Sequence, residues 1–498
     1  MAQADSKPTA TRGAPRSESS DKDIKTAVVV VHGMGEQRPM STLWELVEAL
    51  WIQDPNHCED EFEVYSKPDK VGGSFELRRI TTRRSLHDNK LRVDFFELYW
   101  AHQMQGNTVA AVFASVKRLL VRRSSTVPDR LHSVWVAGWI VMVLAVALSI
   151  VLPMGLEKVL KTIGLELPGG WLGVVGVGFF ALLNLVFGQA LKSWVGPVAG
   201  DAARYLSPDP PNIAARQAIR RQAVDLLEAL HTDDYDRIIV VGHSLGTVVA
   251  YDALCFAFGQ IAHKDLVEAH RDPATARALD DLEELARKLA SDGGATPGNR
   301  TLYRDAQRVY LAQLAKARRG RTKKPLWLVS DFISTGSPLS KADVLLAHNP
   351  ERFARRIKRR DTPVSPPFLE KPPRDLSKKE KGLFRFSHPY HGVRGPHHAA
   401  VFAPTVWTNL YFVTEKVALG DVIAGPVAPL FGPGVLDVRM DRDGKAFRHL
   451  DYWTTHGPNN PPPAWVRSLR KAVNFRRLDE RTLWGAQVDA AEVDSNAV

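Results

Sequence analysis

The stretch RIIVVGHSLGTVVAYDAL, residues 237–254, contains a serine flanked by glycines and joins a strand pattern to a helix pattern. Four β-branched residues precede Gly242, which predicts a strand covered on both faces. Small apolar residues follow Gly246 and predict a helix. A Gly-x-Ser-x-Gly turn in this context holds its serine in a strained backbone conformation with the hydroxyl exposed, and its glycines leave room for neighbouring backbone. The stretch therefore predicts a nucleophile at Ser244.

The rest of the chain repeats the alternation of strand and helix. Runs of β-branched, aromatic or alternating apolar residues predict strands at 27–31, 91–100, 326–333 and 407–412. Residues 41–51 and the amphipathic segment 212–231 predict helices. Strands that alternate with helices indicate an α/β fold with a mostly parallel, doubly wound sheet.

The first predicted strand ends in a turn whose backbone amides can bind an anion. The sequence there reads His32-Gly33-Met34-Gly35. Acyl transfer at a serine creates an oxyanion, which needs preorganised backbone donors. One donor is expected to be the amide of Leu245, directly after the nucleophile, and the other the amide of Met34. His32 and Gly33 are expected to support this turn.

A serine becomes a strong nucleophile only when a base removes its proton, and an acid fixes the tautomer of that base. In α/β hydrolases the three residues follow one another along the chain in the order Ser, Asp, His. The favoured acid is therefore downstream of Ser244, at Asp421, in a glycine-flanked loop after a strand. Asp331 and Asp437 are alternatives.

The favoured base is His449, because aromatic residues follow it and can hold its ring. His456 is the alternative base. Four further histidines, at 388, 391, 397 and 398, lie in a proline-rich stretch with no helical or finger spacing, so we expect no metal site there. The proposed chemistry needs no cofactor.

Two segments, 134–156 and 169–191, contain no charged residue. As helices, each would be about 34 Å long, enough for a hydrocarbon core of about 30 Å. We therefore predict a transmembrane hairpin. Basic residues concentrate before the first segment and follow the second, which predicts an integral membrane protein with both chain ends, and the catalytic domain, in the cytoplasm.

The composition of the chain sets further limits. The 498 residues carry a formal charge of +11, and residues 341–400 hold fourteen Lys or Arg against six Asp or Glu. Their aromatic residues form no nucleic-acid-binding pattern, so we expect a solvated loop or a membrane-facing surface and no nucleic-acid partner. Two cysteines give no disulfide framework and fit a reducing compartment.

These patterns divide the chain. We expect a polar, disordered tail at 1–23 and an α/β domain in two parts, 24–130 and 193–475. The hairpin region, 131–192, lies between the two parts, and a C-terminal tail follows at 476–498. Within the second part, residues 262–322 are expected to form a charged surface insertion and 345–400 a basic, irregular one.

The motifs together resemble the lipase-type α/β hydrolases. The resemblance is carried by VHGMGEQ at 31–37, GHSLG at 242–246, TGSPL at 335–339, Asp421 and HLDYW at 449–453. It implies a serine hydrolase that cleaves carboxylic esters through an acyl-enzyme, with Ser244, Asp421 and His449 as its triad. The hairpin and the basic insertions depart from the pattern.

Location at a bilayer favours lipid esters as substrates, in the manner of a lipase or phospholipase. Three other reactions fit the same triad, those of a thioesterase, a peptidase and an acyltransferase. A catalytically silent membrane scaffold that binds lipid headgroups or a protein partner is the alternative from another class. The sequence does not indicate an oligomeric state.

Overall fold

The computed structural model covers the whole chain. It describes residues 24–33, 38–58, 63–72, 76–86, 90–104, 205, 210–319, 324–347, 349–371, 383–390, 393–413, 420, 421, 423–440, 448–457 and 460–491, together with isolated positions between 135 and 162.

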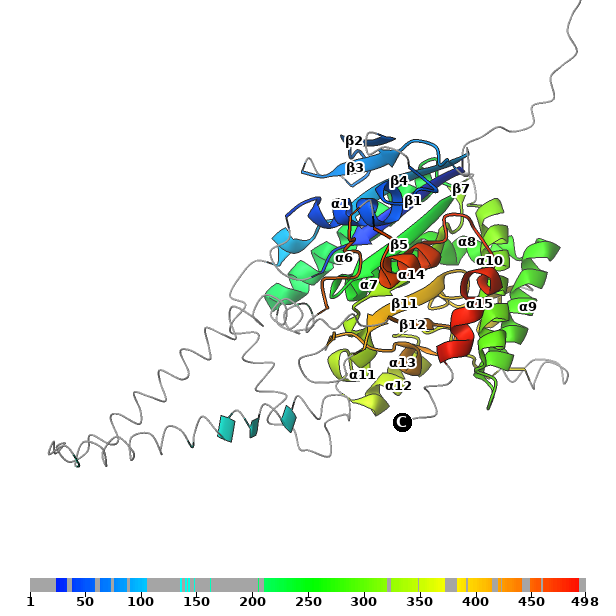
Figure 1. The fold of residues 1–498 in the computed structure, drawn as a ribbon. Helices are drawn as coiled ribbons and strands as arrows, with labels where there is room; N and C mark the ends of the chain where they lie inside the picture. Colours follow the sequence, from blue (N-terminus) through cyan, green and yellow to red (C-terminus); the bar gives the residue numbers. More distant parts are fainter. Residues whose placement is uncertain are drawn as a thin grey trace, which may run out of the picture.

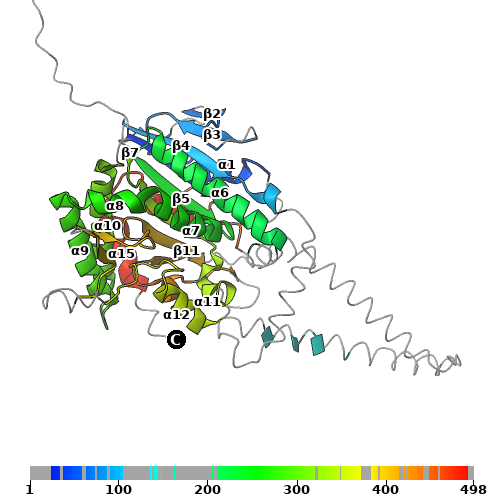
Figure 2. The same cartoon turned by 180° about the vertical axis from the view of Figure 1, so that it is seen from behind.

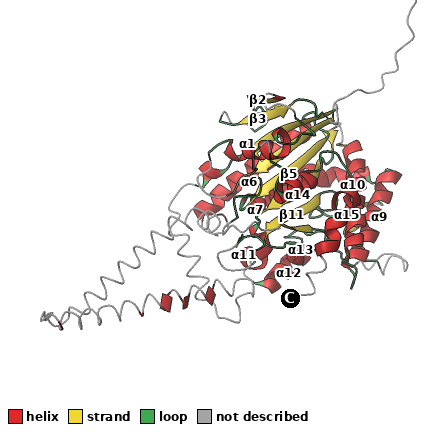
Figure 3. Ribbon diagram, in the orientation of Figure 1, coloured by secondary structure: helices red, strands yellow, loops and turns green. Residues whose placement is uncertain are grey.

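An eight-stranded sheet forms the centre of the molecule (Figures 1 and 3). Its order is β12-β11-β8-β5-β1-β4-β3-β2. The pairs from β12 to β4 are parallel, and β3 and β2 add an antiparallel edge. The strands are β1 (Ile24–Val31), β2 (Val64–Pro68), β3 (Arg78–Thr82), β4 (Leu91–Leu98), β5 (Arg237–His243), β8 (Val329–Thr335), β11 (Val406–Phe412) and β12 (Leu436–Met440).

Helices cover both faces of this sheet. Figure 1 shows α1 and α14 over one face, and Figure 2 shows α6 and α7 over the other. The principal helices are α1 (Ser41–Val47), α6 (Pro210–Thr232), α7 (Gly246–Ala257), α8 (His263–Ala269), α9 (Pro273–Ala290), α10 (Pro297–Lys316), α14 (Ala464–Val473) and α15 (Glu480–Ala491).

Shorter elements connect these helices and strands. They are the π-helical turns η1 (Glu48–Ile52) and η6 (Phe258–Ala262), the 3-10 turns η3 (Ala101–Gln103) and η8 (Pro338–Lys341), the helices α11 (Ala342–Leu345), α12 (Pro350–Lys358) and α13 (Ala428–Phe431), and two small antiparallel pairs, β6 (Arg318–Arg319) with β7 (Lys324–Pro325) and β9 (Ser387–Tyr390) with β10 (Val393–Pro396).

The alternation of side chains along β1 builds two separate apolar cores. Ala27, Val29 and Val31 pack in the core that contains α6 and α7, whereas Val28 and Val30 pack in the core that contains α1 and α14. A strand covered on both faces needs apolar residues at every position. This requirement explains the continuous β-branched run that the sequence shows. The prediction of an α/β fold with a mostly parallel central sheet is confirmed.

The description of residues 262–322 as a surface insertion is wrong in part. Helix α10, inside this segment, buries one face that contacts the sheet. Tyr303, Gln307, Tyr310 and Leu314 lie on that face at helical spacing, and all four are buried. The high charge of the segment hid this spacing, because charged residues also lie on the inward face: Arg304 is buried there and Arg308 is half-buried beside it.

The prediction of a C-terminal tail at 476–498 is also wrong as far as Ala491. Helix α15 begins at Glu480, and Leu483 and Trp484 are buried in the core that contains α1 and α14. Residues 492–498 lie outside the described part. The segment 345–400, expected to be irregular, contains α12 and the β9–β10 pair, and its residues 372–382 lie outside the description.

The predicted membrane spans fall almost entirely on residues that the structure does not describe. Within the described residues, no helix combines the length and apolar character needed to cross a bilayer. The hairpin at 134–156 and 169–191 therefore stays a prediction.

A buried ionic network ties α15 to the sheet. Glu480 Oε2 accepts a hydrogen bond from Arg304 Nε at 2.7 Å, and Glu480 Oε1 lies 2.5 Å from Arg308 Nη2. Arg308 also reaches Asp331 on β8 at 3.2 Å, and Arg237 on β5 contacts the same carboxylate at 2.5 Å. Removing one member of such a network leaves a buried charge with only part of its compensation, which is strongly unfavourable.

We expect Arg304→Leu to lower the free energy of unfolding by about 3–5 kcal/mol, because Glu480 would stay buried and lose its best-buried partner. Arg271→Leu is the matched control, since Arg271 pairs with Glu268 on the exposed surface. That change should cost about 1 kcal/mol or less. Urea unfolding of the purified full chain measures both values, and equal losses would contradict the network's role.

The network also predicts a pH dependence. Burial alone would raise the pKa of Asp331, but Arg308 and Arg237 outweigh it and lower the pKa to about 2. A depressed carboxylate pKa stabilises the fold above the unfolded-state value and loses that effect as the pH falls toward the folded-state value. The stability advantage of the wild type over Asp331→Asn should therefore shrink between pH 5 and pH 3. Urea unfolding across this range measures it, and a constant difference would contradict the assignment.

Candidate active site

Ser244 occupies the sharp turn between β5 and α7. Its φ is 52°, in the left-handed region that L residues rarely adopt. Its amide donates to the carbonyl of Thr335 on β8 at 2.9 Å, and its carbonyl accepts from Thr247. The strained turn that the Gly-x-Ser-x-Gly pattern predicts is therefore present, and neighbouring strands hold it in place.

Both glycines of the turn are required by close backbone contacts. A Cβ at Gly242 would lie 2.8 Å from the Cα of Thr247. A Cβ at Gly246 would collide with the carbonyl oxygens of Val31 and His32. The start of α7 thus passes directly over the end of β1, and only glycine allows this approach.

The structure brings Ser244, His449 and Asp421 into one hydrogen-bonded chain. Ser244 Oγ donates to His449 Nε2 at 2.8 Å, and His449 Nδ1 donates to Asp421 Oδ2 at 2.9 Å. All three residues are buried, with exposed fractions of 1%, 2% and 0%. With its Nδ1 proton held by a carboxylate, His449 presents an unprotonated Nε2 to the serine, as a general base must.

Four donors converge on the carboxylate of Asp421. His449 and the hydroxyl of Tyr452 share Oδ2, and the amides of Ile423 and Ala424 donate to Oδ1. Burial would raise the pKa of Asp421, but the bond to His449, its charge, the Tyr452 bond and the amides hold the pKa below its ordinary value. The carboxylate is therefore ionised and can stabilise an imidazolium.

The alternative residues have other partners. Asp331 belongs to the ionic network on β5 and β8. Asp437 accepts hydrogen bonds from the amides at the start of α13 and from Asn409. His456 is exposed and packs edge-on against Trp465. Of the candidates that the sequence left open, Asp421 and His449 are thus the ones that the structure brings into the hydrogen-bonded chain with Ser244.

His32 fixes the turn that follows β1. Its Nδ1 donates to the carbonyl of Gly33 at 2.8 Å, and its Nε2 accepts from the amide of Trp100 at 3.0 Å. Its ring stacks on Trp100 with 5.0 Å between centroids. Burial lowers the pKa of His32 to about 4, so the ring stays neutral and keeps both bonds at neutral pH.

The turn after β1 approaches Ser244 closely. A Cβ added at Gly33 would lie only 3.0 Å from the Cβ of Ser244. Met34, the expected second oxyanion donor, lies outside the described residues. Leu245, the expected first donor, is buried at the N-terminal end of α7, where backbone amides have no partner within the helix and can bind an anion.

His243 contributes a contact that the sequence did not indicate. Its Nε2 donates to the backbone carbonyl of His449 at 2.7 Å, and the two rings lie 5.0 Å apart. Burial, and then the nearby His449, lower the pKa of His243 to about 3. The neutral ring therefore joins the turn of Ser244 directly to the backbone of His449.

Segment 335–339 supports the site from β8. Gly336 has a φ of +61°, and a Cβ there would lie 2.8 Å from Tyr452 Cε2 and 3.3 Å from both Asp421 Oδ2 and His449 Cε1. The Ser337 hydroxyl lies 2.7 Å from that of Thr247 on α7. The sequence marked this segment only as part of a resemblance, because its contacts come from distant parts of the chain.

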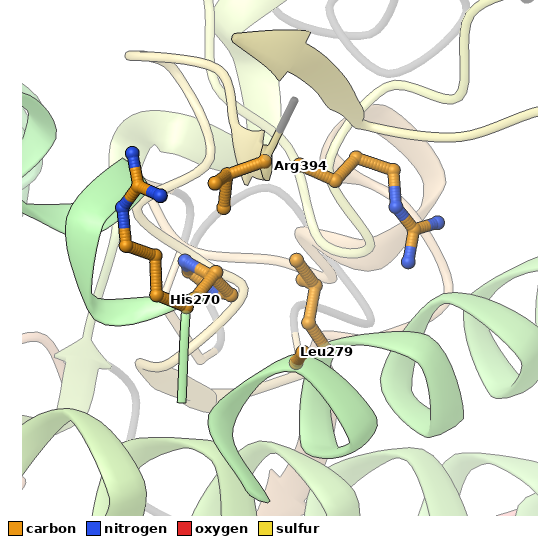
Figure 4. A pocket seen from close by; sticks show the side chains of 6 residues that line it. His270, Leu279 and Arg394 are labelled. Atoms are coloured by element: carbon orange, nitrogen blue, oxygen red, sulfur yellow. The ribbon is translucent and has the colours of Figure 1, made fainter. Parts of the chain in front are cut away.

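Other features lie apart from this constellation. A cavity of about 390 Å³ lies between α8, α9 and β10, with His270, Leu279 and Arg394 in its lining (Figure 4). A second cavity of about 350 Å³ lies near residues 231–236. Neither lining includes a triad residue. Among the described residues, no group of three or more His, Cys, Asp or Glu is arranged for a metal ion, and His391 falls outside them.

Comparison with known proteins adds no assignment. The chain matches no protein-family model, no curated protein and no solved structure.

Gly336→Ala should disturb the triad more than the fold. The new Cβ would push on Tyr452, Asp421 and His449, so we expect the rate at which a fluorophosphonate modifies Ser244 to fall on the order of 10- to 100-fold. Gly293→Ala is the matched control, because Gly293 has a φ of +69° with no atom within 4 Å of the added Cβ. Both variants should lose about 1–2 kcal/mol of stability from the left-handed conformation. Equal modification rates in the two variants would contradict this assignment.

Proposed function

We propose that this protein is a serine hydrolase of the α/β-hydrolase class that cleaves carboxylic esters. One observation carries the proposal, the chain of hydrogen bonds from Ser244 through His449 to Asp421. A buried serine bonded to a histidine nitrogen, whose other nitrogen is bonded to a carboxylate, is the arrangement that activates a serine for acyl transfer. The order of the three residues in the chain, and the strand-turn-helix setting of Ser244, support the class.

The chemistry would run in two stages. Ser244 Oγ attacks the ester carbonyl while its proton passes to His449 Nε2, and Asp421 stabilises the imidazolium that forms. His449 then returns the proton to the departing alcohol, which leaves an acyl group on Ser244. Water, deprotonated by the same nitrogen, attacks the acyl-enzyme and releases the carboxylic acid.

The oxyanion of each stage needs donors on the side of the carbonyl away from His449. The Leu245 amide, at the start of α7, is in the position expected for one of them. The position of Gly33 beside Ser244, with its carbonyl held by His32, supports the expectation of a second donor in the turn after β1. Loss of one such donor typically costs about 3 kcal/mol of transition-state stabilisation.

Lipid esters are the proposed substrates. The apolar segments 134–156 and 169–191 are the main support, since two membrane spans would hold the catalytic domain at the cytoplasmic face of a bilayer. Attachment to a bilayer would favour an apolar acyl substrate over a small soluble ester.

A fluorophosphonate reacts covalently with activated serines, so it should label Ser244 of the wild type. Ser244→Ala and His449→Ala should reduce the labelling rate at least about a thousandfold. Two changes serve as matched controls. Ser334→Ala removes a buried serine hydroxyl that bonds to Asn409, and His456→Ala removes the exposed histidine. Both controls should label at near the wild-type rate, as measured on detergent-solubilised full-length protein.

The substrate class is tested with phospholipids, acylglycerols and short soluble esters, each given to the wild type and to Ser244→Ala. Release of fatty acid that depends on Ser244 would support lipid esters. Labelled protein that cleaves only the soluble esters would overturn the lipid assignment and keep the hydrolase. A folded wild type that takes up no label would overturn the hydrolase and favour a silent scaffold.

A further inference from the structure

Tyr452 lies three residues after His449 and is buried beside the triad. Its exposed fraction is 1%. Its ring lies 4.9 Å from that of Phe412 on β11 and 5.7 Å from that of His243. The packing fixes the ring, and the hydroxyl reaches the acid of the proposed triad.

Two contacts determine where the hydroxyl proton of Tyr452 points. The amide of Phe412 lies 3.3 Å from the phenolic oxygen, and an amide can only donate. The proton of the phenol is therefore directed to Asp421 Oδ2, at 2.7 Å. Burial, and then the charge of Asp421, hold the pKa of Tyr452 well above its ordinary value, so the hydroxyl stays a donor.

The same carboxylate oxygen accepts the Nδ1 proton of His449 at 2.9 Å. A second donor on Oδ2 has two effects. It holds Asp421 Oδ2 in the position from which this oxygen accepts the Nδ1 proton of His449, and it reduces the negative charge on that oxygen. A less concentrated charge on Asp421 stabilises the protonated form of His449 less.

We propose that Tyr452 is a positioning residue that orients Asp421 Oδ2 toward His449 and, through this carboxylate, sets the pH range in which His449 can act as a base. The proposal rests on the proposed serine-hydrolase function.

The test uses the pH dependence of fluorophosphonate labelling, which requires no knowledge of the natural ester. In this reaction a bond forms between Ser244 Oγ and phosphorus, the bond from phosphorus to fluorine breaks, and fluoride leaves. The serine proton passes to His449 Nε2. The rate constant therefore falls at low pH as the His449–Asp421 pair takes up a proton, and this acid limb has an apparent pKa that belongs to the pair.

Tyr452→Phe removes the donor and keeps the ring. The charge on Asp421 Oδ2 becomes more concentrated, so protonated His449 persists to higher pH. We expect the acid limb to move upward by roughly half to one pH unit, and the plateau rate to fall on the order of tenfold as Oδ2 loses its orientation. Tyr303→Phe is the control. It removes a buried hydroxyl that bonds to the carbonyl of Phe402 on another part of the fold, and it should leave the limb in place.

A second substitution keeps the hydrogen bond and reverses the sign. Incorporation of 3,5-difluorotyrosine at position 452 makes the phenol a stronger donor, so the acid limb should move to lower pH. Opposite shifts in the two proteins would support the proposal, because a purely structural role would move neither limb. A lower plateau with unmoved limbs would overturn it and leave Ser244 as the labelled nucleophile. Failure of the wild type to label at Ser244 would overturn the hydrolase function and the role of Tyr452 together.

Discussion

The close approach of the β5–α7 turn to the ends of β1 and β8 governs the rest of the site. Ser244 has a φ of 52°, a conformation that costs on the order of 1–2 kcal/mol for an L residue. The turn keeps it because Gly246 passes over the carbonyls of β1 and because Thr335 on β8 accepts the amide of Ser244. The strain is thus balanced by the parallel sheet and holds the hydroxyl at one position.

Contacts around that position connect segments that are far apart in the chain. His243 bonds to the carbonyl of His449, and Gly336 leaves room for Tyr452. Each of these residues holds the backbone or the ring of another part of the site. Because the interior is close-packed, a change at any of them is transmitted to the others. The triad is therefore held by a scaffold drawn from β1, β5, β8 and the loops after β11 and β12.

The sequence predicted the parts of the fold and the site that depend on local pattern. Ser244 could be found because a buried strand, two glycines and a small-residue helix surround it within eighteen residues. His243 and Gly336 could not, since their roles arise from contacts with residues about 85 to 200 positions away in the chain. The burial of Glu480 was missed for a similar reason. A charged residue near the C-terminus suggests solvent until its partners, Arg304 and Arg308, are known.

The place of Glu480 has a consequence for how the chain is made. As the ribosome releases the polypeptide from its N-terminus, Arg304 and Arg308 emerge more than 170 residues before the carboxylate that neutralises them. Until then, two guanidinium groups lack part of their counter-charge, and burying them is unfavourable. The packing of α10 against the core is therefore completed only after residue 480 has been made. A product interrupted before Glu480 would have to bury Arg304 without its carboxylate partner, which is unfavourable by several kcal/mol.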